Sequence, residues 1–321
     1  MTRLDSVEEV SSGNKKKKDE ERSKPISAIF SDYDGTLCSA SAARDKSIGQ
    51  NRIPSKIKQA LQQISRYIPI CIISSKDFFF LKEASSFARV ISCLMGIEML
   101  TFASNHDPAA DEPTQIHRKL LANESRFYTN SYWLEEIARN IESDIEFEEI
   151  RVERKYTSDR RILAGITLDW SHTKNREYYK KGVQDFVCAL VRHLSQRPQP
   201  INLYLQKYNS HPFVDLYSVE CNKGIGFDAV LSEISTISCK SSGDNRITNN
   251  IIKPGNVLYL GDSENDNPAF RKAGLSIGVQ SDSRLTPRLE CQYVINFDIV
   301  ADFLLRLREN QLIFKQGLLT G

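Results

Sequence analysis

Three short apolar segments each stop abruptly at polar side chains, and this recurrence constrains the fold more than any other feature of the sequence. Strands that are apolar throughout are typical of a parallel sheet that is covered on both faces. Such sheets bind their ligands at the carboxyl ends of the strands, so the polar side chains at these ends are candidate site residues. The segments are residues 26–30, 69–73 and 256–260, and they lead into Asp32, Ser74 and Asp262.

Helix-forming segments follow the first two predicted strands. Pro54 opens a stretch in which Ile57, Leu61 and Ile64 lie on one helical face, and a proline in the first turn has no N–H to leave unpaired. Residues 78–90 are predicted to form the helix after the second strand. The repeated strand, loop and helix indicate an α/β fold with a parallel sheet.

The pattern changes between residues 104 and 218. Because the parallel pattern resumes at residue 256, we interpret this segment as an inserted α+β module. Its predicted helices lie at residues 132–141 and 177–194, and its predicted strands at 146–152, 162–168 and 201–205.

The termini and one internal stretch lack the pattern of a packed element. The first 24 residues are charged and almost without apolar side chains, so we expect a disordered tail. Residues 235–253 are rich in Ser, Asn and Gly and are predicted to form an exposed loop. The 321-residue chain is thus divided into a tail (1–24), a core (25–103 and 219–321) and an inserted module (104–218).

Composition excludes several classes of function. Lys and Arg number 43 against 41 Asp and Glu, a balance that argues against a nucleic-acid partner or an acidic membrane surface. No apolar run approaches the roughly 18 residues of a membrane span, and no secretory signal precedes the core, so the expected compartment is the cytoplasm. Seven cysteines without a CxxC pair indicate neither a disulfide framework nor a zinc site. The oligomeric state is left open.

Carboxylates gather where two of the predicted strands end. Asp32 and Asp34 are two residues apart and would share one face of an extended chain, while Gly35 lets the backbone turn after them. Asp262 and Asp266 follow another strand. Hard oxygen ligands of this kind favour Mg²⁺, which also holds phosphate oxygens. Ser74 would donate its hydroxyl to a phosphoryl oxygen, and Lys223, at the predicted start of a helix, would neutralise that group's charge.

These residues fall into four ordered motifs that resemble those of the haloacid dehalogenase superfamily. The motifs are DYDGT at 32–36, IISS at 72–75, NKG at 222–224 and GDSEND at 261–266. The resemblance implies a Rossmannoid core with a parallel sheet. It also implies a phosphatase in which Asp32 is the nucleophile that forms an aspartyl phosphate, and Asp34 is the general acid and base. In this family pattern Asp32, the Asp34 carbonyl oxygen and Asp262 hold Mg²⁺, and Asp266 supports the metal ligands.

The inserted module is similar to the larger (C2-type) cap of sugar phosphatases related to trehalose-phosphatase and mannosyl-3-phosphoglycerate phosphatase. Residues 96–98 resemble the stretch that enters this cap, and Glu153 and Lys155 resemble an acid and base that touch sugar hydroxyls. Lys76 stands where these relatives often carry Arg. The sequence departs from them at Ser75, which replaces a glycine, and in GDSENDN, which differs from the GDDxTDE of trehalose-phosphatases.

The resemblance implies a Mg²⁺-dependent phosphatase of a small phosphorylated sugar, with trehalose 6-phosphate as the first substrate to test. Mannosyl-3-phosphoglycerate is the alternative substrate, and a non-catalytic sugar-phosphate-binding protein or a phosphomutase are the alternative functions. For Glu153 and Lys155, a solvated strand face is as good an interpretation as a sugar site.

Overall fold

The computed structural model describes residues 23–39, 53–103, 114–121, 124–198, 200–208, 211–240, 252–280 and 288–320. Most of the predicted disordered tail lies outside these residues. Its last residue, Lys24, belongs to strand β1 (Lys24–Pro25), which pairs antiparallel with β14 (Ile313–Phe314). The prediction that the tail extends to residue 24 is therefore wrong at that end, because the backbone there completes a two-stranded sheet.

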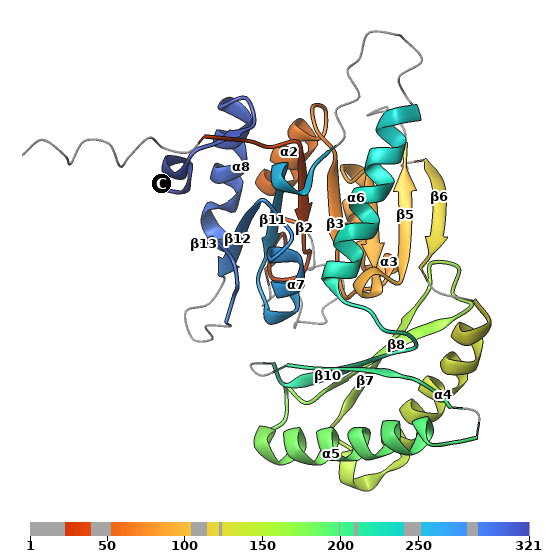
Figure 1. The fold of residues 1–321 in the computed structure, drawn as a ribbon. Coiled ribbons are helices and arrows are strands. Elements are labelled where there is room, and N and C mark those ends of the chain that lie inside the picture. Colours follow the sequence, from red (N-terminus) through yellow and green to blue (C-terminus); the bar gives the residue numbers. More distant parts are fainter. Residues whose placement is uncertain are drawn as a thin grey trace, which may run out of the picture.

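The main sheet has eight strands in the order β13-β12-β11-β2-β3-β4-β5-β6 (Figure 1). The six strands from β13 to β4 are parallel, and β5 and β6 add to the β4 edge in antiparallel directions. The strands are β2 (Ala28–Ser31), β3 (Ile70–Ile73), β4 (Val90–Cys93), β5 (Glu98–Phe102), β6 (Gln115–Leu120), β11 (Val257–Gly261), β12 (Leu275–Gln280) and β13 (Tyr293–Asn296).

Helices cover both faces of the main sheet. The face that carries Ile29 packs with α2 (Ser55–Ile64) and α8 (Val300–Glu309), and the face that carries Ala28 and Phe30 packs with α6 (Lys223–Lys240) and α7 (Asn267–Phe270). Successive residues of β2 point to opposite faces, and all four are buried. Burial on both sides explains why these strands are apolar throughout.

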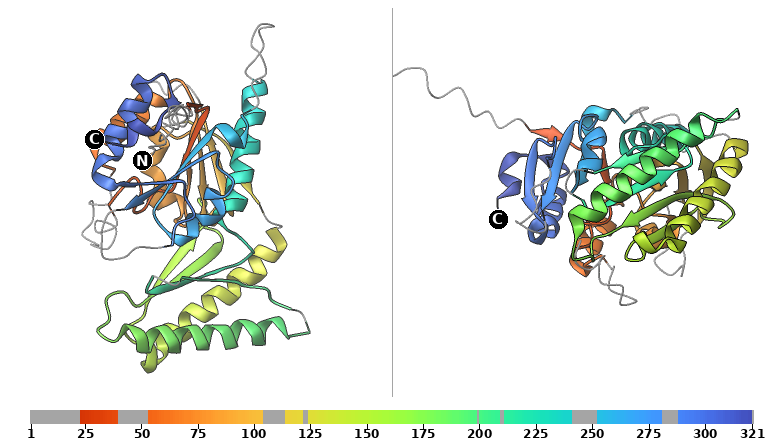
Figure 2. Two further views of the ribbon diagram at one scale, coloured as in Figure 1. Left: turned by 60° about the vertical axis from the view of Figure 1, so that its left-hand side comes forward. Right: turned by 90° about the horizontal axis from the view of Figure 1, so that it is seen from below.

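A second, four-stranded antiparallel sheet follows the order β7-β8-β10-β9. Its strands are β7 (Arg151–Tyr156), β8 (Leu163–Asp169), β9 (Tyr204–Lys207) and β10 (Phe213–Tyr217), and its helices are α4 (Glu124–Ser143) and α5 (Arg176–Ser195). Both helices lie on the face that points away from the main sheet (Figures 1 and 2). We call this sheet with its two helices the second unit.

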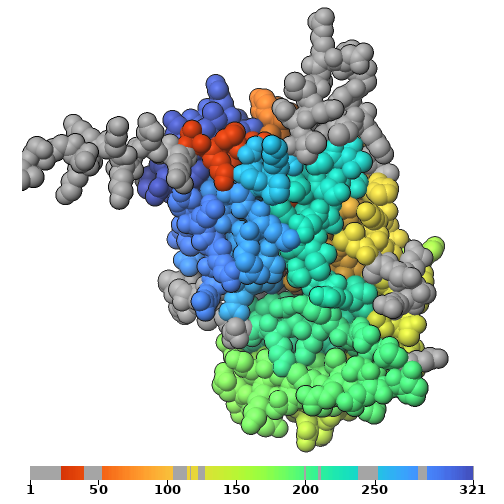
Figure 3. All heavy atoms as spheres, viewed as in Figure 1, coloured from red at the N-terminus to blue at the C-terminus, as the bar shows by residue number. Residues whose placement is uncertain are grey.

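Alternation along the strands of the second unit separates a core face from a polar face. In β10, Val214 and Leu216 join the core beneath the helices, whereas Asp215 and Tyr217 point to the opposite side. In the space-filling view the yellow-green and green atoms of the second unit lie below the blue and teal atoms of residues 223–320 (Figure 3). The polar face of the second sheet is therefore turned toward the carboxyl ends of the parallel strands.

The predicted helix at 78–90 is wrong over most of its length. Helix α3 covers only Phe78–Leu81, a 3-10 turn follows at Lys82–Ser86, and the chain then enters β4. Val90 and Ile91 are fully buried beside β3. Pairing with a neighbouring strand overrides local helix propensity there.

Several other boundaries also differ from the prediction, among them the strand expected at 201–205, which spans Tyr204–Lys207. The strand expected at 146–152 begins only at Arg151, because residues 145–147 form a 3-10 turn. Residues up to 240 of the expected 235–253 loop continue helix α6, and 241–251 lie outside the described residues. Strand β6, which we assigned to the inserted module, pairs with β5 in the main sheet.

Among the described residues, no helix combines the length and apolar character needed to cross a membrane.

Candidate active site

Asp32 and Asp34 lie directly after β2, in the middle of the parallel sheet. The Asp32 amide donates to the Leu260 carbonyl of β11 at 2.8 Å, which continues the ladder between the two strands by one residue. Asp32 is 4% exposed and Asp34 is half-buried. The strand thus delivers both carboxylates to the carboxyl edge of the sheet, as the sequence predicted.

Lys223, the first residue of α6, joins two of the carboxylates. Its ammonium lies 2.9 Å from Asp32 Oδ1 and 2.7 Å from Asp266 Oδ1, and the whole side chain is buried. Burial alone would lower the pKa of Lys223, but the adjacent carboxylates outweigh burial and raise it. Lys223 therefore stays charged and fixes the position of Asp32.

Asp266 is occupied by structural contacts. Its Oδ1 also accepts from Tyr259 Oη at 2.7 Å, and its Oδ2 accepts from the amides of Asp262 and Ser263 at 3.2 and 3.1 Å. These bonds fix the conformation of the loop after β11 and so position Asp262. Asp266 thus contacts the backbone that carries Asp262.

Gly35 allows the turn after Asp34 to lie close to the loop after β11. Its φ is +84°, in the left-handed region that favours glycine, and a Cβ at this position would run into the carboxylate of Asp262. Only glycine lets the turn after Asp34 lie against the loop after β11. The DYDGT and GDSEND motifs are thus in contact.

The carboxylate cluster carries more negative charge than Lys223 neutralises. Asp32, Asp262 and Asp266 each offer an oxygen within 4.8 Å of the others, and Asp34 stands beside them at the cavity. Burial, together with the neighbouring carboxylates, raises the pKa of Asp32 to about 6, against the opposing effect of Lys223. The same causes raise the pKa of Asp262. A divalent cation would reverse both shifts, so the donor set fits a hard metal ion such as Mg²⁺.

A cavity of about 240 Å³ opens between the main sheet and the second unit. Its lining combines motif residues of the main sheet with polar residues of the second sheet. From the main sheet come Asp32, Asp34, Ser75, Lys76, Asp262, Ser263 and Asn265, and from the second unit Arg151, Val152, Glu153, Lys155, Thr167, Asp169, Ser171, His211, Pro212, Phe213 and Asp215. Asp32, Asp34, Asp262 and Lys76 therefore share one chamber with Glu153 and Lys155.

Lys76 and Glu153 meet across this cavity. The Lys76 ammonium lies 3.2 Å from Glu153 Oε1 and over the ring of Phe80. Burial opposes the charge on Lys76, but Glu153 and Asp34 outweigh it and raise the Lys76 pKa. Burial likewise opposes the charge on Glu153, and the ammonium groups of Lys76 and Lys155 lower the Glu153 pKa. The pair ties the second unit to the loop after β3.

Lys155 lies in a different environment from Glu153, although both are on β7. It is 2% exposed, and its ammonium donates to Asp215 Oδ1 at 2.9 Å. Asp215 also accepts from the hydroxyls of Thr167, Tyr208 and Tyr217. A solvated strand face is therefore excluded for Lys155, whereas Glu153 is exposed and faces the cavity.

Ser74 stands at the carboxyl end of β3 and is buried, with its hydroxyl accepting from the Lys76 amide at 3.3 Å. The residues that line the cavity from this loop are Ser75 and Lys76. The structure therefore brings Ser74 next to the chamber but directs its two successors into it. Residues 96–98, expected to enter the cap, instead lead into β5 of the main sheet.

Sequence reasoning missed most of the second-unit lining. Asp215 carried a recognisable pattern, a single carboxylate within the otherwise apolar strand 213–217. Arg151, Thr167, Asp169 and His211 carried none, because a polar residue on or beside a strand gives no sign of which face it will meet until the partner sheet is known.

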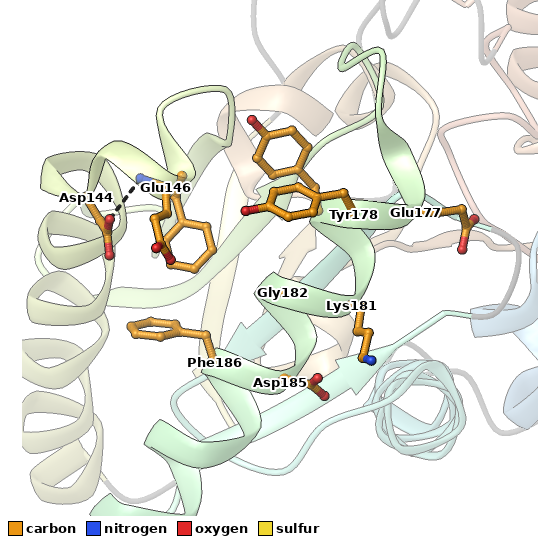
Figure 4. Close-up of a pocket in the computed structure, with 10 residues that line it drawn as sticks. Asp144, Glu146, Glu177, Tyr178, Lys181, Gly182, Asp185 and Phe186 are labelled. Carbon is orange, nitrogen blue, oxygen red and sulfur yellow. Dashed lines mark hydrogen bonds between the residues drawn. The ribbon is translucent and has the colours of Figure 1, made fainter.

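A larger depression, about 610 Å³, lies on the outer side of the second unit between α5 and the 145–147 turn (Figure 4). It is lined by aromatic rings and carboxylates with one ammonium group, from Lys181. None of the motif residues lines it. The smaller cavity at the carboxylate cluster is therefore the candidate active site.

No protein-family model and no curated protein matches this sequence. Solved structures do match the fold. A trehalose-6-phosphate phosphatase related protein superposes with a TM-score of 0.57 at 14% identity, over 89% of this chain and 99% of the other. The C-terminal domain of trehalose-6-phosphate phosphatase from C. albicans gives 0.60 at 15% identity, over 89% and 94% of the two chains. A haloacid dehalogenase-like hydrolase from Bacteroides thetaiotaomicron gives 0.51 at 16%, over 88% and 99%.

The chain thus has the fold of the haloacid dehalogenase-type phosphatases. The α/β class with a largely parallel sheet is confirmed. Because each match covers nearly nine tenths of this chain, it includes residues of both the main sheet and the second unit.

Proposed function

We propose that this protein is a Mg²⁺-dependent phosphatase of a small phosphorylated sugar, acting through an aspartyl phosphate on Asp32. The observation that carries the proposal is the shared cavity, in which Asp32, Asp34 and Asp262 face polar side chains of the second unit. Residues 25–103 and 219–321, together with β6, would form the catalytic core. The second unit would be the cap.

Asp32 is placed to attack phosphorus. Its carboxylate oxygen would form a bond to the phosphoryl group while the bond from phosphorus to the sugar oxygen breaks, and Asp34 would give a proton to that oxygen. A water molecule would then attack the phosphoryl group, return its proton to Asp34 and release inorganic phosphate with free Asp32. Lys223, 2.9 Å from Asp32 Oδ1, holds the nucleophile in one orientation and offsets the charge of the transferred group.

Mg²⁺ would be held by Asp32, the Asp34 carbonyl oxygen and Asp262, and when bound it would neutralise charge on the phosphoryl oxygens. Asp266 would keep Asp262 in place through the backbone bonds described above. Ser74 would contribute hydrogen bonding to the phosphate from the loop after β3, as the motif order implies.

The volume of the cavity indicates the size of substrate that it can hold. About 240 Å³ lies below the usual range of pockets for drug-sized ligands, roughly 300–1,000 Å³. The likeness to trehalose-6-phosphate phosphatases makes trehalose 6-phosphate the first substrate to test. The small chamber adds monosaccharide phosphates to the panel, with mannosyl-3-phosphoglycerate as a further member.

The test measures inorganic phosphate released from this panel and from p-nitrophenyl phosphate, with Mg²⁺ and with EDTA. We expect a sugar phosphate to be hydrolysed in Mg²⁺, activity to stop in EDTA, and added Mg²⁺ to restore it. Full activity in chelator would contradict the metal assignment. Saturable binding of a sugar phosphate without any phosphate release would instead support the non-catalytic alternative.

A further inference from the structure

A buried carboxylate in the main sheet holds one end of the second unit. Glu98, the first residue of β5, is fully buried, and its Oε2 accepts from the Ser158 amide at 2.9 Å. Its Oε1 accepts from the Ser158 hydroxyl at 2.7 Å and from Arg118 Nε at 2.6 Å. Ser158 belongs to the turn between β7 and β8, so Glu98 joins the two sheets.

The rest of this turn is fixed from the same side. Arg118, on β6, also lies 3.1 Å from Asp159 Oδ2, and the Arg160 guanidinium stacks 4.2 Å above the ring of Phe79. We call Glu98, Arg118, Ser158 and Asp159 the turn clamp. Each of the two sheets supplies two of its members.

The turn clamp lies at the end of the strand that reaches the cavity. Strand β7 carries Glu153 and Lys155 and ends at Tyr156, two residues before Ser158. Lys76 contacts Glu153 from the main sheet at 3.2 Å. The turn clamp therefore anchors β7 at a point where a small displacement would move Glu153 relative to Asp32 and Asp34.

We infer that Glu98 is a positioning residue that sets the height and orientation of β7 above the nucleophile, and so governs how a sugar phosphate is held. This inference rests on the proposed function. Glu98 touches no reacting atom and acts through the backbone and hydroxyl of Ser158. A substrate that makes no contact with β7 should be insensitive to it.

The test compares Glu98→Gln with the wild-type chain on two substrates, the sugar phosphate hydrolysed best and p-nitrophenyl phosphate. Glutamine keeps the size but removes the charge that binds Arg118 and strengthens the bonds from Ser158. We expect kcat/KM for the sugar phosphate to fall about tenfold and that for p-nitrophenyl phosphate to change less than about twofold. Arg118→Gln, at a partly exposed edge-strand position, loosens the turn clamp from its other side and should give the same selectivity.

Thr101→Val is the matched control. Thr101 is buried on the same strand, but its hydroxyl donates to Glu233 of α6 at 3.1 Å and not to the turn. A purely structural part for Glu98 predicts equal losses on both substrates, as for Thr101→Val, and would overturn the inference. A double-mutant cycle adds a second criterion: in a Glu153→Gln background, Glu98→Gln should have little further effect on the sugar phosphate.

Limited proteolysis separates this inference from the proposed function. Arg160 and Arg161 make the turn a trypsin site, so cleavage there should be about tenfold faster in Glu98→Gln and unchanged in Thr101→Val. Equal cleavage in wild type and Glu98→Gln would overturn the turn clamp whatever the substrate. A wild-type chain that hydrolyses no sugar phosphate would overturn the proposed function, and the trypsin rates would still decide whether Glu98 holds the turn.

Discussion

Asp32 illustrates how a site residue can be well ordered and yet unfavourable for folding. Burial holds its pKa above the ordinary value of an aspartate, so at neutral pH its negative charge lowers the free energy of unfolding. Lys223 offsets part of this penalty and retains a second carboxylate partner, Asp266, if the charge on Asp32 is removed. The functional charge and the stability of the fold are therefore separable.

Replacing Asp32 with asparagine should abolish turnover without lowering the melting temperature. An amide cannot attack phosphorus, so we expect kcat to fall by roughly a thousandfold or more. Asp228→Asn is the control, because Asp228 also pairs with a lysine, Lys272 at 2.5 Å, but on the surface. Steady-state kinetics and thermal unfolding of both variants test this. Residual activity of a tenth of wild type in Asp32→Asn would contradict the nucleophile assignment.

Asp215 and Lys155 form a buried ion pair whose contribution depends on pH. Burial opposes the charge on Asp215, but Lys155 and the hydroxyls of Thr167 and Tyr208 outweigh it and lower the Asp215 pKa. In the unfolded chain the Asp215 pKa is about 3.9, and in the folded protein it is lower. The ionised carboxylate therefore contributes its full stabilisation above about pH 3.9, and this stabilisation is lost as the pH falls through the folded-state pKa.

Asp215→Asn should consequently destabilise the fold by about 3 kcal/mol at pH 7, because it leaves Lys155 buried without its counter-charge. Below about pH 4 the difference from wild type should narrow. Urea unfolding at pH 7 and pH 3.5 measures both values. The double variant Asp215→Asn with Lys155→Met should recover much of the loss, and a difference that is constant with pH would contradict the assignment.

At the scale of elements, the sequence predicted best those helices and strands whose apolar pattern follows directly from their burial. Strands β2, β3 and β11 and helix α2 agree with their apolar patterns. Burial on both faces leaves a short continuous apolar run, and burial along one stripe of a helix leaves a helical period. Strands β4 and β5 were missed, since residues 90–102 are mostly apolar without a clear period. The pairing of β4 with β3, and of β5 with β4, cannot be read from that pattern. In the site, the four motifs predicted the main-sheet residues, whereas the lining of the second unit depends on which faces meet.

Alanine is expected to have opposite effects on stability at two glycines of the second unit. Gly182 lies on the exposed side of α5, where an added Cβ would meet nothing within 4 Å, so alanine should stabilise the helix by about 0.5–1 kcal/mol. Gly165 lies on β8, where a Cβ would come within 2.6 Å of the Tyr217 ring, so alanine should destabilise by about 1–3 kcal/mol. Thermal unfolding of the two variants checks the signs. A lower melting temperature for Gly182→Ala would show that its open side is needed.

At the scale of the whole molecule, two sheets with different tasks meet at one chamber. The main sheet supplies the cluster of Asp32, Asp34 and Asp262, and the second unit supplies most of the remaining polar lining. This division predicts that changes in the main sheet affect every phosphate ester, whereas changes in the second unit affect only substrates large enough to reach it. The family resemblance treats Glu153 and Lys155 alike, as groups that touch sugar hydroxyls, but Lys155 is buried in an ion pair with Asp215. Removing Lys155 would therefore change the stability of the fold.

Glu153 is the cleaner probe, because its side chain is 47% exposed and its bond to Lys76 crosses the cavity without supporting a core. An ion pair of this exposure contributes about 0–1 kcal/mol, so Glu153→Gln should leave the melting temperature nearly unchanged. If Glu153 binds sugar hydroxyls, its loss should lower kcat/KM for the sugar phosphate about tenfold and leave kcat/KM for p-nitrophenyl phosphate within about twofold of wild type.

Glu142→Gln is the matched control. Glu142 belongs to the same unit, is 43% exposed and pairs with Arg154 at 2.7 Å, but it does not line the cavity. Equal losses on both substrates in Glu153→Gln would mean that Glu153 only orders Lys76, and no loss on either would remove it from the site.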